Sequence, residues 1–411
     1  MQANSPPCAN SQSVRWKRRW LRRAGCDPKP TKLVLPDSRG GTMPLRVVLI
    51  GAAGVFGSRI ARRLCGDPRF EVILAGRRRA SLDTLVDALG PSHASASTLD
   101  LEAADFPSAL ARLHPQLVIH AAGPFQNRDY GVAEACLDCD SDYVDLADGR
   151  AFVSGIRCLH ARAMRAGRLV VSGASSVPGL SSAVVDALLP KFETLDSIEH
   201  AISPGNRTPR GDATVASILG YCGHPIRIWR NGEWRVAHGW MDGKRQKFPF
   251  GTRRVGVCEV PDLELFPERY PNVRTVVFRA GLELSLLQAG TWCASALVRL
   301  GVIRNLAMHA PALRRISERF IGFGSDVGGM VVEVHGKGRD GSPLHLRWWL
   351  VADAGHGPEV PVTPTVVLAG ELADGRLAAK GAQPCMGLLG LEQIEAGFSA
   401  YAVRTGVKVI G

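Results

Sequence analysis

The sequence lacks any uninterrupted apolar run as long as a membrane-spanning helix, which needs about 20 residues. Its nearest candidate, residues 284–298, is 15 residues long, contains Gln288 and Thr291, and lies between Glu283 and Arg299. Runs of this length are typical of buried helices or of helices that lie along a surface. We therefore expect a helix of that kind here and no membrane span.

Closely spaced cysteine pairs are nearly absent as well. Among ten cysteines, only Cys136 and Cys139 are near each other, inside a predicted helix. One such pair supplies half of the ligands of a structural zinc site, and no second pair accompanies it. The pair also lacks the sequence setting of a thioredoxin-like redox motif. We expect thiols in the core, no metal site, no disulfide framework and a cytoplasmic location.

Three common catalytic signatures are missing. No tyrosine is followed four residues later by lysine, which excludes the short-chain reductase pattern. Gly173-Ala-Ser175 lacks the closing glycine of a hydrolase nucleophile elbow, because residue 177 is valine. No His-Glu-x-x-His occurs, so a zinc hydrolase is not expected.

Positive charge is concentrated at the N-terminus. Of the formal net charge of +12, residues 1–42 contribute +7, from nine Lys or Arg and two Asp. The remaining 369 of the 411 residues are therefore only mildly basic. No nucleic-acid partner is expected for them, and any nucleic-acid footprint would lie in the N-terminal segment.

Residues 1–42 combine Pro, Ser and basic residues without a sustained apolar period, which predicts a disordered tail. The segment has no apolar core of a secretory signal, and an organelle transit peptide is the alternative interpretation. Met43 stands shortly before the first predicted strand. We therefore expect Met43 to be the biological start.

The most informative motif occupies residues 46–57. A β-branched apolar run over Arg46–Ile50 leads into three glycines and then into a helical pattern. A strand, a glycine turn and a helix N-terminus in this order are how a Rossmann fold binds a dinucleotide pyrophosphate. A plain structural turn is the alternative. The predicted cofactor-binding residues of this loop are Gly51, Ala53, Gly54, Val55, Phe56 and Gly57.

The end of the second predicted strand distinguishes NAD from NADP. An NAD-specific domain usually has an acidic residue here, which binds the ribose 2′-hydroxyl. This chain instead reads Ala75-Gly76-Arg77-Arg78-Arg79. Guanidinium groups pair well with a 2′-phosphate, so Arg77 and Arg78 predict NADP as the cofactor. We expect Arg79 to lie on the solvated surface.

Alternating strands and helices predict an α/β fold, a Rossmann doubly wound parallel sheet over residues 43–180. The predicted strands after the first are Glu71–Ala75, Leu117–His120, Asp142–Asp145 and Leu169–Val171. The predicted helices are Ser81–Leu89, Glu102–Leu113, Tyr130–Leu137 and Phe152–Ala166.

Hairpin turn signals at Asn231-Gly232 and Asp340-Gly341 indicate a different second domain. For residues 181–365 we expect an α+β domain on a mainly antiparallel sheet, with helices near 284–300 and 310–320. Two amphipathic stretches, Pro364–Leu372 and Leu391–Ala402, predict that residues 366–411 are helical and pack back on the Rossmann domain.

Several motifs together resemble the saccharopine dehydrogenase-like NADP-binding domain family. They are the glycine loop, Ala75-Gly76-Arg77, Ala122-Gly123-Pro124-Phe125, Tyr143-Val144-Asp145, residues 173–179 and residues 381–392. The resemblance covers residues 46–182 and implies NADP binding. Relatives reduce imines to secondary amines or reduce lipid double bonds, so the resemblance does not specify the substrate.

Motifs at the carboxyl ends of predicted strands supply the remaining site candidates, because ligands of doubly wound sheets bind there. Ala122, Gly123, Pro124 and Phe125 are expected beside the cofactor, with a plain turn as the alternative. The candidate proton donors are Tyr143, Asp145 and Ser175. Asp145 could equally orient a substrate amine or a backbone turn. A helix starting near Ser181 could leave N–H groups free for a ligand.

Two features predict different substrates. Arg207 and Arg210 could clamp substrate carboxylates or be surface residues. Leucine-rich residues 280–303 instead indicate an apolar substrate or weak association with a lipid surface. We expect a homodimeric NADP-dependent oxidoreductase, which transfers hydride between NADPH and an imine, carbonyl or enoyl small molecule. A non-catalytic NADP-binding sensor or scaffold is the alternative.

Overall fold

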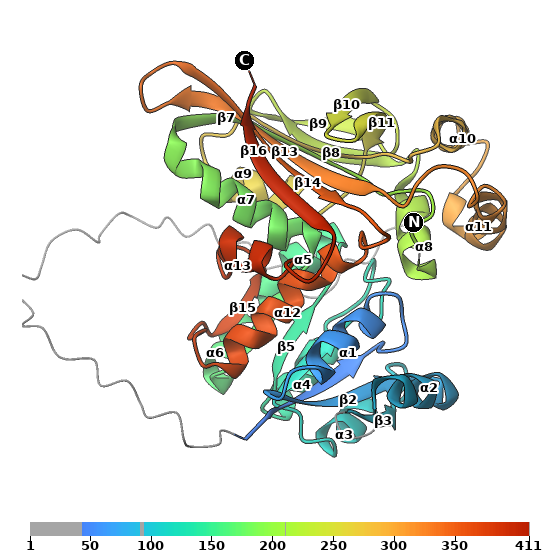
Figure 1. The fold of residues 1–411 in the computed structure, drawn as a ribbon, viewed down its shortest axis with the longest axis vertical. Helices are drawn as coiled ribbons and strands as arrows, with labels where there is room; N and C mark the ends of the chain where they lie inside the picture. Colours follow the sequence, from blue (N-terminus) through green and yellow to red (C-terminus); the bar gives the residue numbers. More distant parts are fainter. Residues whose placement is uncertain (1–42, 91–93, 210, 411) are drawn as a thin grey trace, which may run out of the picture. The chain divides into compact units, whose positions relative to one another are not determined.

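The computed structural model describes residues 43–90, 94–209 and 211–410. The tail predicted for residues 1–42 lies outside the described residues, as does Arg210. Two sheets organise the described chain (Figure 1). The domain boundaries expected from the sequence stay a prediction.

The first sheet has seven strands in the order β15-β6-β5-β4-β1-β2-β3, and every neighbouring pair is parallel. Its strands are β1 (Leu45–Ile50), β2 (Phe70–Gly76), β3 (Ala94–Thr98), β4 (Leu117–His120), β5 (Asp142–Asp145), β6 (Leu169–Ser172) and β15 (Gly381–Pro384). Strand order reverses between β1 and β4, where doubly wound folds bind their ligands. The predicted Rossmann sheet is confirmed.

Helices cover both faces of this sheet. Alternate residues of β1 point to opposite faces, so each face has an apolar layer that a helix must cover. Val47 and Leu49 pack in the core beneath α1, α2, α7 and α12, and Val48 and Ile50 pack beneath α3, α4 and α6. The helices are α1 (Gly57–Cys65), α2 (Arg79–Leu89), α3 (Phe106–Ala111), α4 (Gly131–Asp138), α5 (Arg150–Gly155), α6 (His160–Ala166), α7 (Ser181–Leu188), α12 (Glu359–Ala373) and α13 (Leu391–Ala396). Short turns of helix occupy Ile156–Leu159, Ser176–Leu180 and Leu189–Lys191.

The second sheet has nine strands and is mixed rather than purely antiparallel. The sheet comprises β7 (Phe192–Ser203), β8 (Pro225–Arg230), β9 (Glu233–His238), β10 (Lys244–Phe248), β11 (Gly251–Val257), β12 (Thr275–Ala280), β13 (Gly328–Gly338), β14 (Pro343–Ala352) and β16 (Val403–Val409). Its helices are α8 (Asp212–Tyr221), α9 (Asp262–Arg269), α10 (Ser285–Arg299), η4 (Leu306–His309) and α11 (Ala310–Glu318). Both predicted hairpins form, as β8–β9 and β13–β14, whereas β12 runs parallel to β7.

A buried polar contact joins the second sheet to the helices beneath it. Asp262 at the start of α9 accepts a hydrogen bond from Ser181 at 2.5 Å, and the same Oδ2 atom lies 2.8 Å from Nε2 of His200. All three residues are buried. Polar groups so far from water are stable only when paired, so this contact specifies how α7, α9 and β7 meet.

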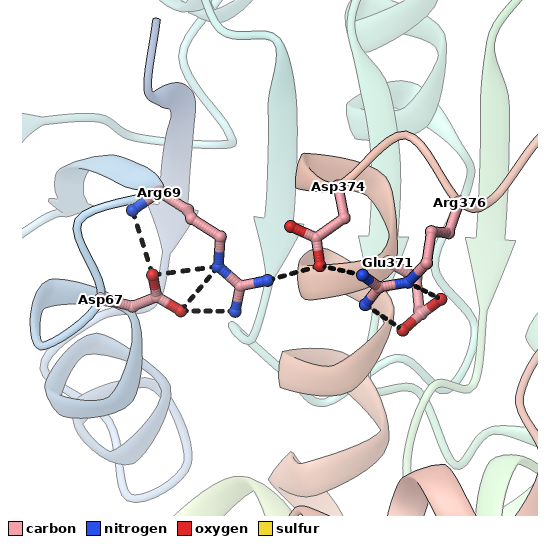
Figure 2. Close-up of polar contacts among 5 residues, drawn as sticks. All are labelled: Asp67, Arg69, Glu371, Asp374 and Arg376. Carbon is pink, nitrogen blue, oxygen red and sulfur yellow. Dashed lines mark hydrogen bonds and ion pairs between the residues drawn. The ribbon is translucent and has the colours of Figure 1, made fainter. Parts of the chain in front are cut away.

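The C-terminal part of the chain returns to the first sheet through α12. Figure 2 shows that Arg69, which follows α1, pairs with Asp67 and with Asp374, both at 2.6 Å. Asp374 also pairs with Arg376 at 2.7 Å, and Arg376 pairs in turn with Glu371. The network links the end of α1 to the end of α12. Because its arginines are well exposed, we expect only a small contribution to stability.

Three predicted helices are wrong in extent. The helix expected over Phe152–Ala166 breaks at Gly155. A Cβ at Gly155 would lie 2.5 Å from the Tyr130 hydroxyl. That hydroxyl donates a hydrogen bond to the Phe152 carbonyl. The helix expected over Glu102–Leu113 spans only Phe106–Ala111, because Pro107 is tolerated only in a first turn. The third error concerns the C-terminus.

The helix expected over Leu391–Ala402 ends at Ala396, and Val403–Val409 forms a strand that pairs with β14. Residues 366–411 are therefore not simply helical: β15 extends the first sheet and β16 extends the second. The prediction missed β15 because its sequence, Gly-Ala-Gln-Pro, has no β-branched residue, and an edge position tolerates its proline.

Candidate active site

The glycine loop lies where β1 ends and the strand order reverses. Gly51 has a φ of +80°, and a Cβ there would lie 2.8 Å from the backbone nitrogen of Ala122. At Gly57, a Cβ would lie 2.1 Å from the carbonyl oxygen of Gly51. Both positions require glycine, Gly51 for the turn at the end of β1 against the loop after β4 and Gly57 for packing α1 against the glycine loop.

The loop presents unpaired backbone donors at the start of α1. Within the described chain, the N–H groups of Ala53, Val55 and Phe56 donate no hydrogen bond to another residue. The first turn of α1 contains no acidic residue, and no side chain caps it. A helix N-terminus with free N–H groups and partial positive charge favours an anion such as a pyrophosphate.

Arginines follow β2 at the same edge of the sheet. Arg77 and Arg78 are exposed, and neither guanidinium group makes a hydrogen bond or ion pair with any residue that the structure describes. Arg79 is exposed as expected, but it pairs with Asp83 at 2.8 Å. Two free guanidinium groups therefore stand at the position where a dinucleotide presents its 2′-substituent.

The loop after β4 lies beside the glycine loop. Ala122 forms the close contact with Gly51, and Gly123, Pro124 and Phe125 follow it. The Phe125 ring packs edge-on against His120 at 4.9 Å between centroids. This packing holds the loop against the sheet, so the structure brings the loop at 122–125 together with the loop at 51–57.

Tyr143 and Asp145 lie in a buried row of polar groups across β4, β5 and β6. The Tyr143 hydroxyl is 3.1 Å from Nδ1 of His120, and burial lowers the pKa of His120 to about 4. Burial also raises the pKa of Tyr143 well above its ordinary value. Tyr143 and Asp145 are fully buried, and their predicted catalytic roles stay predictions.

Asp145 organises the backbone around the end of β5. Its Oδ1 atom accepts hydrogen bonds from the backbone of Ala147 and Gly173 and from the Ser172 hydroxyl, at 2.8–2.9 Å. Burial raises the pKa of Asp145 to about 6. Of the two roles considered for Asp145, these contacts correspond to the orientation of a turn.

Ser175 and Ser176 begin the turn before α7, which starts at Ser181 as expected. Ser175 is buried, and its backbone N–H donates to the Gly173 carbonyl at 2.8 Å. Its neighbour Ser176 lines an apolar cavity. The catalytic role of Ser175 stays a prediction.

An apolar cavity of about 220 Å³ opens between the glycine loop and the second sheet. Its wall includes Phe56 and Ser176 from the Rossmann half, and residues from the loop after β7, from β13 and β14, and from the start of α12. The other lining residues are Ile202, Pro204, Thr208, Pro209, Gly211, Gly328, Gly329, Met330, Leu350, Ala352, Gly357, Pro358, Val360 and Pro361. None of them is titratable, so the cavity favours an apolar ligand.

Asp148 is a half-buried carboxylate near the loop at 122–125 that was not among the residues predicted from the sequence. Asp148 follows β5 and accepts a hydrogen bond from Gln126 at 3.0 Å and one from Ser217 of α8 at 3.4 Å. Burial raises the pKa of Asp148. A carboxyl group of this kind at the ligand-binding edge is a candidate acid. Its place directly after a predicted strand was the available signal.

Arg207, one of the two arginines considered as substrate clamps, does not line this cavity. Arg207 is exposed and donates to the Gly322 carbonyl at 3.1 Å, and Arg210 lies outside the described residues. Elsewhere, Glu333, His335 and His345 lie close enough to hold a cation. Arg347 and Lys244 already pair with Glu333, at 2.6 and 3.6 Å, and would repel one.

Because Asp145 is more easily protonated in the folded than in the unfolded chain, the folded state binds more protons between about pH 4 and 6. Its contribution to stability is therefore full below pH 4 and is lost as the pH rises through 6. We expect the free energy of unfolding of the wild type to fall by about 3 kcal/mol relative to that of Asp145→Asn between about pH 4 and 6, because the variant lacks the titrating group. Urea unfolding at a series of pH values measures this difference.

The matched variant Asp145→Ala also removes the charge, but leaves three buried donors without an acceptor. We expect it to be roughly 3–5 kcal/mol less stable than Asp145→Asn at every pH. Equal pH dependence in wild type and Asp145→Asn would contradict the assignment.

Comparisons with known proteins agree with this geometry. Residues 47–171 match the family described as the saccharopine dehydrogenase NADP binding domain. Among solved structures, saccharopine dehydrogenase (L-Glu forming) from Saccharomyces cerevisiae is similar, with a TM-score of 0.64 and 13% identity over 90% of this chain and 100% of that one.

The homospermidine synthase from Legionella pneumophila, solved in complex with NAD, has a TM-score of 0.57 at 10% identity, over 90% of this chain and 92% of that one. No curated protein matches the chain in sequence. None of the helices in residues 43–90, 94–209 and 211–410 has both the length and the hydropathy to span a bilayer. Residues 47–171 thus match the saccharopine dehydrogenase NADP binding domain family, within a chain whose fold is similar to that of saccharopine dehydrogenase.

Proposed function

We propose that this protein is an NADP-dependent reductase that acts on an apolar imine, carbonyl or enoyl compound. The observation that carries the proposal is the apolar cavity, because Phe56 of the glycine loop forms part of its wall. A ligand in the cavity would therefore lie next to a dinucleotide held by that loop. The family of residues 47–171 and the oxidoreductase fold support the same class of reaction.

The residues present fit a nicotinamide dinucleotide. The free N–H groups of residues 53, 55 and 56 suit its pyrophosphate, and Arg77 and Arg78 suit a 2′-phosphate. The loop at 122–125 would border the nicotinamide, which supplies a hydride when bound. We favour NADP over NAD because two unpaired guanidinium groups replace the usual acidic residue.

The size and chemistry of the cavity favour a small apolar substrate. Its volume of about 220 Å³ equals that of roughly seven water molecules. A substrate rich in carboxylates needs arginine partners, and no arginine among the residues that the structure describes lines the wall. This cavity therefore supports a ketone, imine or enoyl group on a hydrocarbon chain rather than a dicarboxylic amino acid.

Reduction also needs a proton, and Asp148 is the donor that we favour. The raised pKa keeps its carboxyl group protonated to a higher pH than an exposed aspartate. Gln126 and Ser217 hold the carboxyl near the loop at 122–125. Tyr143, Asp145 and Ser175 remain competing proposals, although all three are buried away from the cavity.

One observation favours the second candidate function, a sensor or scaffold that binds NADP without turnover. Among the described residues, no titratable side chain lines the cavity. A reductase must then take its proton from a described group that does not line the wall, such as Asp148, or from ordered water. A sensor needs no such group, so turnover is the measurement that separates the two functions.

Cofactor preference provides the first test. We expect Arg77→Ala and Arg78→Ala each to weaken NADPH binding about tenfold or more, since each loses a charge-assisted hydrogen bond, and to leave NADH binding unchanged. Arg79→Ala is the matched control, because Arg79 pairs with Asp83. Titration of cofactor fluorescence gives each Kd. Tighter binding of NADH than of NADPH by the wild type would refute the NADP assignment.

Substrate class provides the second test. We expect the wild type to oxidise NADPH with apolar ketones, imines or enoyl esters, and not with carboxylate-rich analogues. Pro209→Trp should raise KM at least tenfold, because it places a ring at the exposed wall of the cavity, and should leave the Kd of NADPH unchanged. NADPH binding without turnover across the panel would instead support the sensor.

The proton donor provides the third test. We expect Asp148→Asn to lower kcat about 100-fold at unchanged NADPH affinity, because general acids contribute roughly 10²–10⁴ in rate. The wild-type rate should fall as the pH rises through the pKa of Asp148, and the variant should lack this limb. Tyr143→Phe and Ser175→Ala should retain the limb. If instead Tyr143→Phe or Ser175→Ala lost this fall in rate while Asp148→Asn kept it, the residue changed in that variant would be the proton donor.

A further inference from the structure

Exposed apolar side chains concentrate in one segment. Among the described residues, nine of the fifteen exposed large apolar side chains fall between residues 286 and 323, which we call the 286–323 surface. The most exposed include Leu286, Leu300, Val302, Met308 and Phe323, at 63–77% of their full area. Apolar groups gathered in this way mark a binding surface more often than single exposed residues do.

Helix α10 exposes an apolar stripe, unlike an ordinary surface helix. Its inward side buries Val298 together with the polar Gln288 and Ser295, at 7%, 6% and 0% exposure. Its outward side carries Leu286, Leu297 and Leu300, which are 67%, 41% and 75% exposed and recur at i, i+11 and i+14. In water a helix turns its apolar stripe inward, so this orientation indicates an apolar partner outside the protein.

The charge on the same segment is strongly positive. Residues 284–323 contain five arginines and a single acidic residue, Glu318, which pairs with Arg314 at 2.8 Å. The arginines are Arg299, Arg304, Arg314, Arg315 and Arg319. Long basic side chains beside an apolar stripe are typical of helices that lie in the headgroup region of anionic membranes.

A cavity of about 210 Å³ at the start of α10 is lined by Arg245, Arg254 and Ser285, and by Arg253 and Glu283, which pair with each other at 3.2 Å. Its net charge is therefore positive, from Arg245 and Arg254. Arg245 and Arg254 face each other directly across β10 and β11, and within the described chain neither has an acidic partner. Like charges at opposed positions destabilise a sheet unless an anion neutralises them. A lipid phosphate at this place would do so.

We propose that the 286–323 surface docks the protein on an anionic lipid bilayer, with α10 lying in the plane of the interface. In Figure 1, α10 and α11 lie outside the second sheet rather than beneath it. No helix of the described chain can span a bilayer, so the contact is peripheral. A second copy of the chain is a poorer occupant, because a two-fold interface would bring the same arginines against one another.

Flotation of the full-length protein with vesicles tests this inference. We expect binding to phosphatidylcholine vesicles that contain phosphatidylglycerol, and little binding to phosphatidylcholine alone. The double variant Leu297→Glu/Leu300→Glu should lower bound protein at least tenfold, because it removes apolar area and adds repelled charge. Val236→Glu on β9 is the matched control, since Val236 is 63% exposed but lies outside the surface.

The basic residues within 1–42 offer a second route to anionic lipid, and salt separates the two routes. We expect wild-type binding to persist in part at about 0.5 M salt, where purely electrostatic attachment is screened. The Kd of NADPH, unchanged in the double variant, establishes that it is folded. Equal flotation of wild type and double variant would overturn the proposal. The proposal would also be overturned if the wild type did not float with the vesicles. It would be overturned as well if the wild type were a dimer and the double variant a monomer.

Discussion

The close approach of two backbones at the edge of the first sheet is the constraint on which the rest of the site depends. Gly51 turns away from β1 against the backbone of Ala122, where any side chain would collide. That contact sets where the glycine loop lies, where α1 begins and where the loop after β4 passes. Because the order of strands reverses here, the two loops diverge and leave room for a dinucleotide between them.

Helix α1 transmits this position to the rest of the molecule. Arg59 on α1 pairs with Glu359 at 3.1 Å, and Arg63 donates to Thr363 at 2.7 Å. Both partners belong to α12, whose first residues line the apolar cavity together with Phe56. The helix that presents free N–H groups to an anion is therefore tied by side-chain contacts to the helix that shapes the cavity.

Polarity is divided sharply across this region. The cavity is lined by apolar residues, whereas the row His120, Tyr143, Asp145 and Ser172 lies buried in the sheet. These polar groups are occupied in holding strands and turns together, which buried polar groups must do to be stable. Asp148 differs from them, because it is half-buried and lies next to the loop at 122–125.

The sequence alone determined the elements whose signals are local. A β-branched strand, spaced glycines and a helical pattern predicted β1, the loop and α1, and a periodic pattern predicted the parallel sheet. Local signals could not reveal β15, which has a weak strand sequence and is stabilised only by pairing with β6. Tertiary structure alone also decided which serine faces the cavity, that Asp145 orients a turn, and that α10 exposes its leucines. Each of these depends on contacts between segments far apart in the chain, which a sequence pattern does not encode.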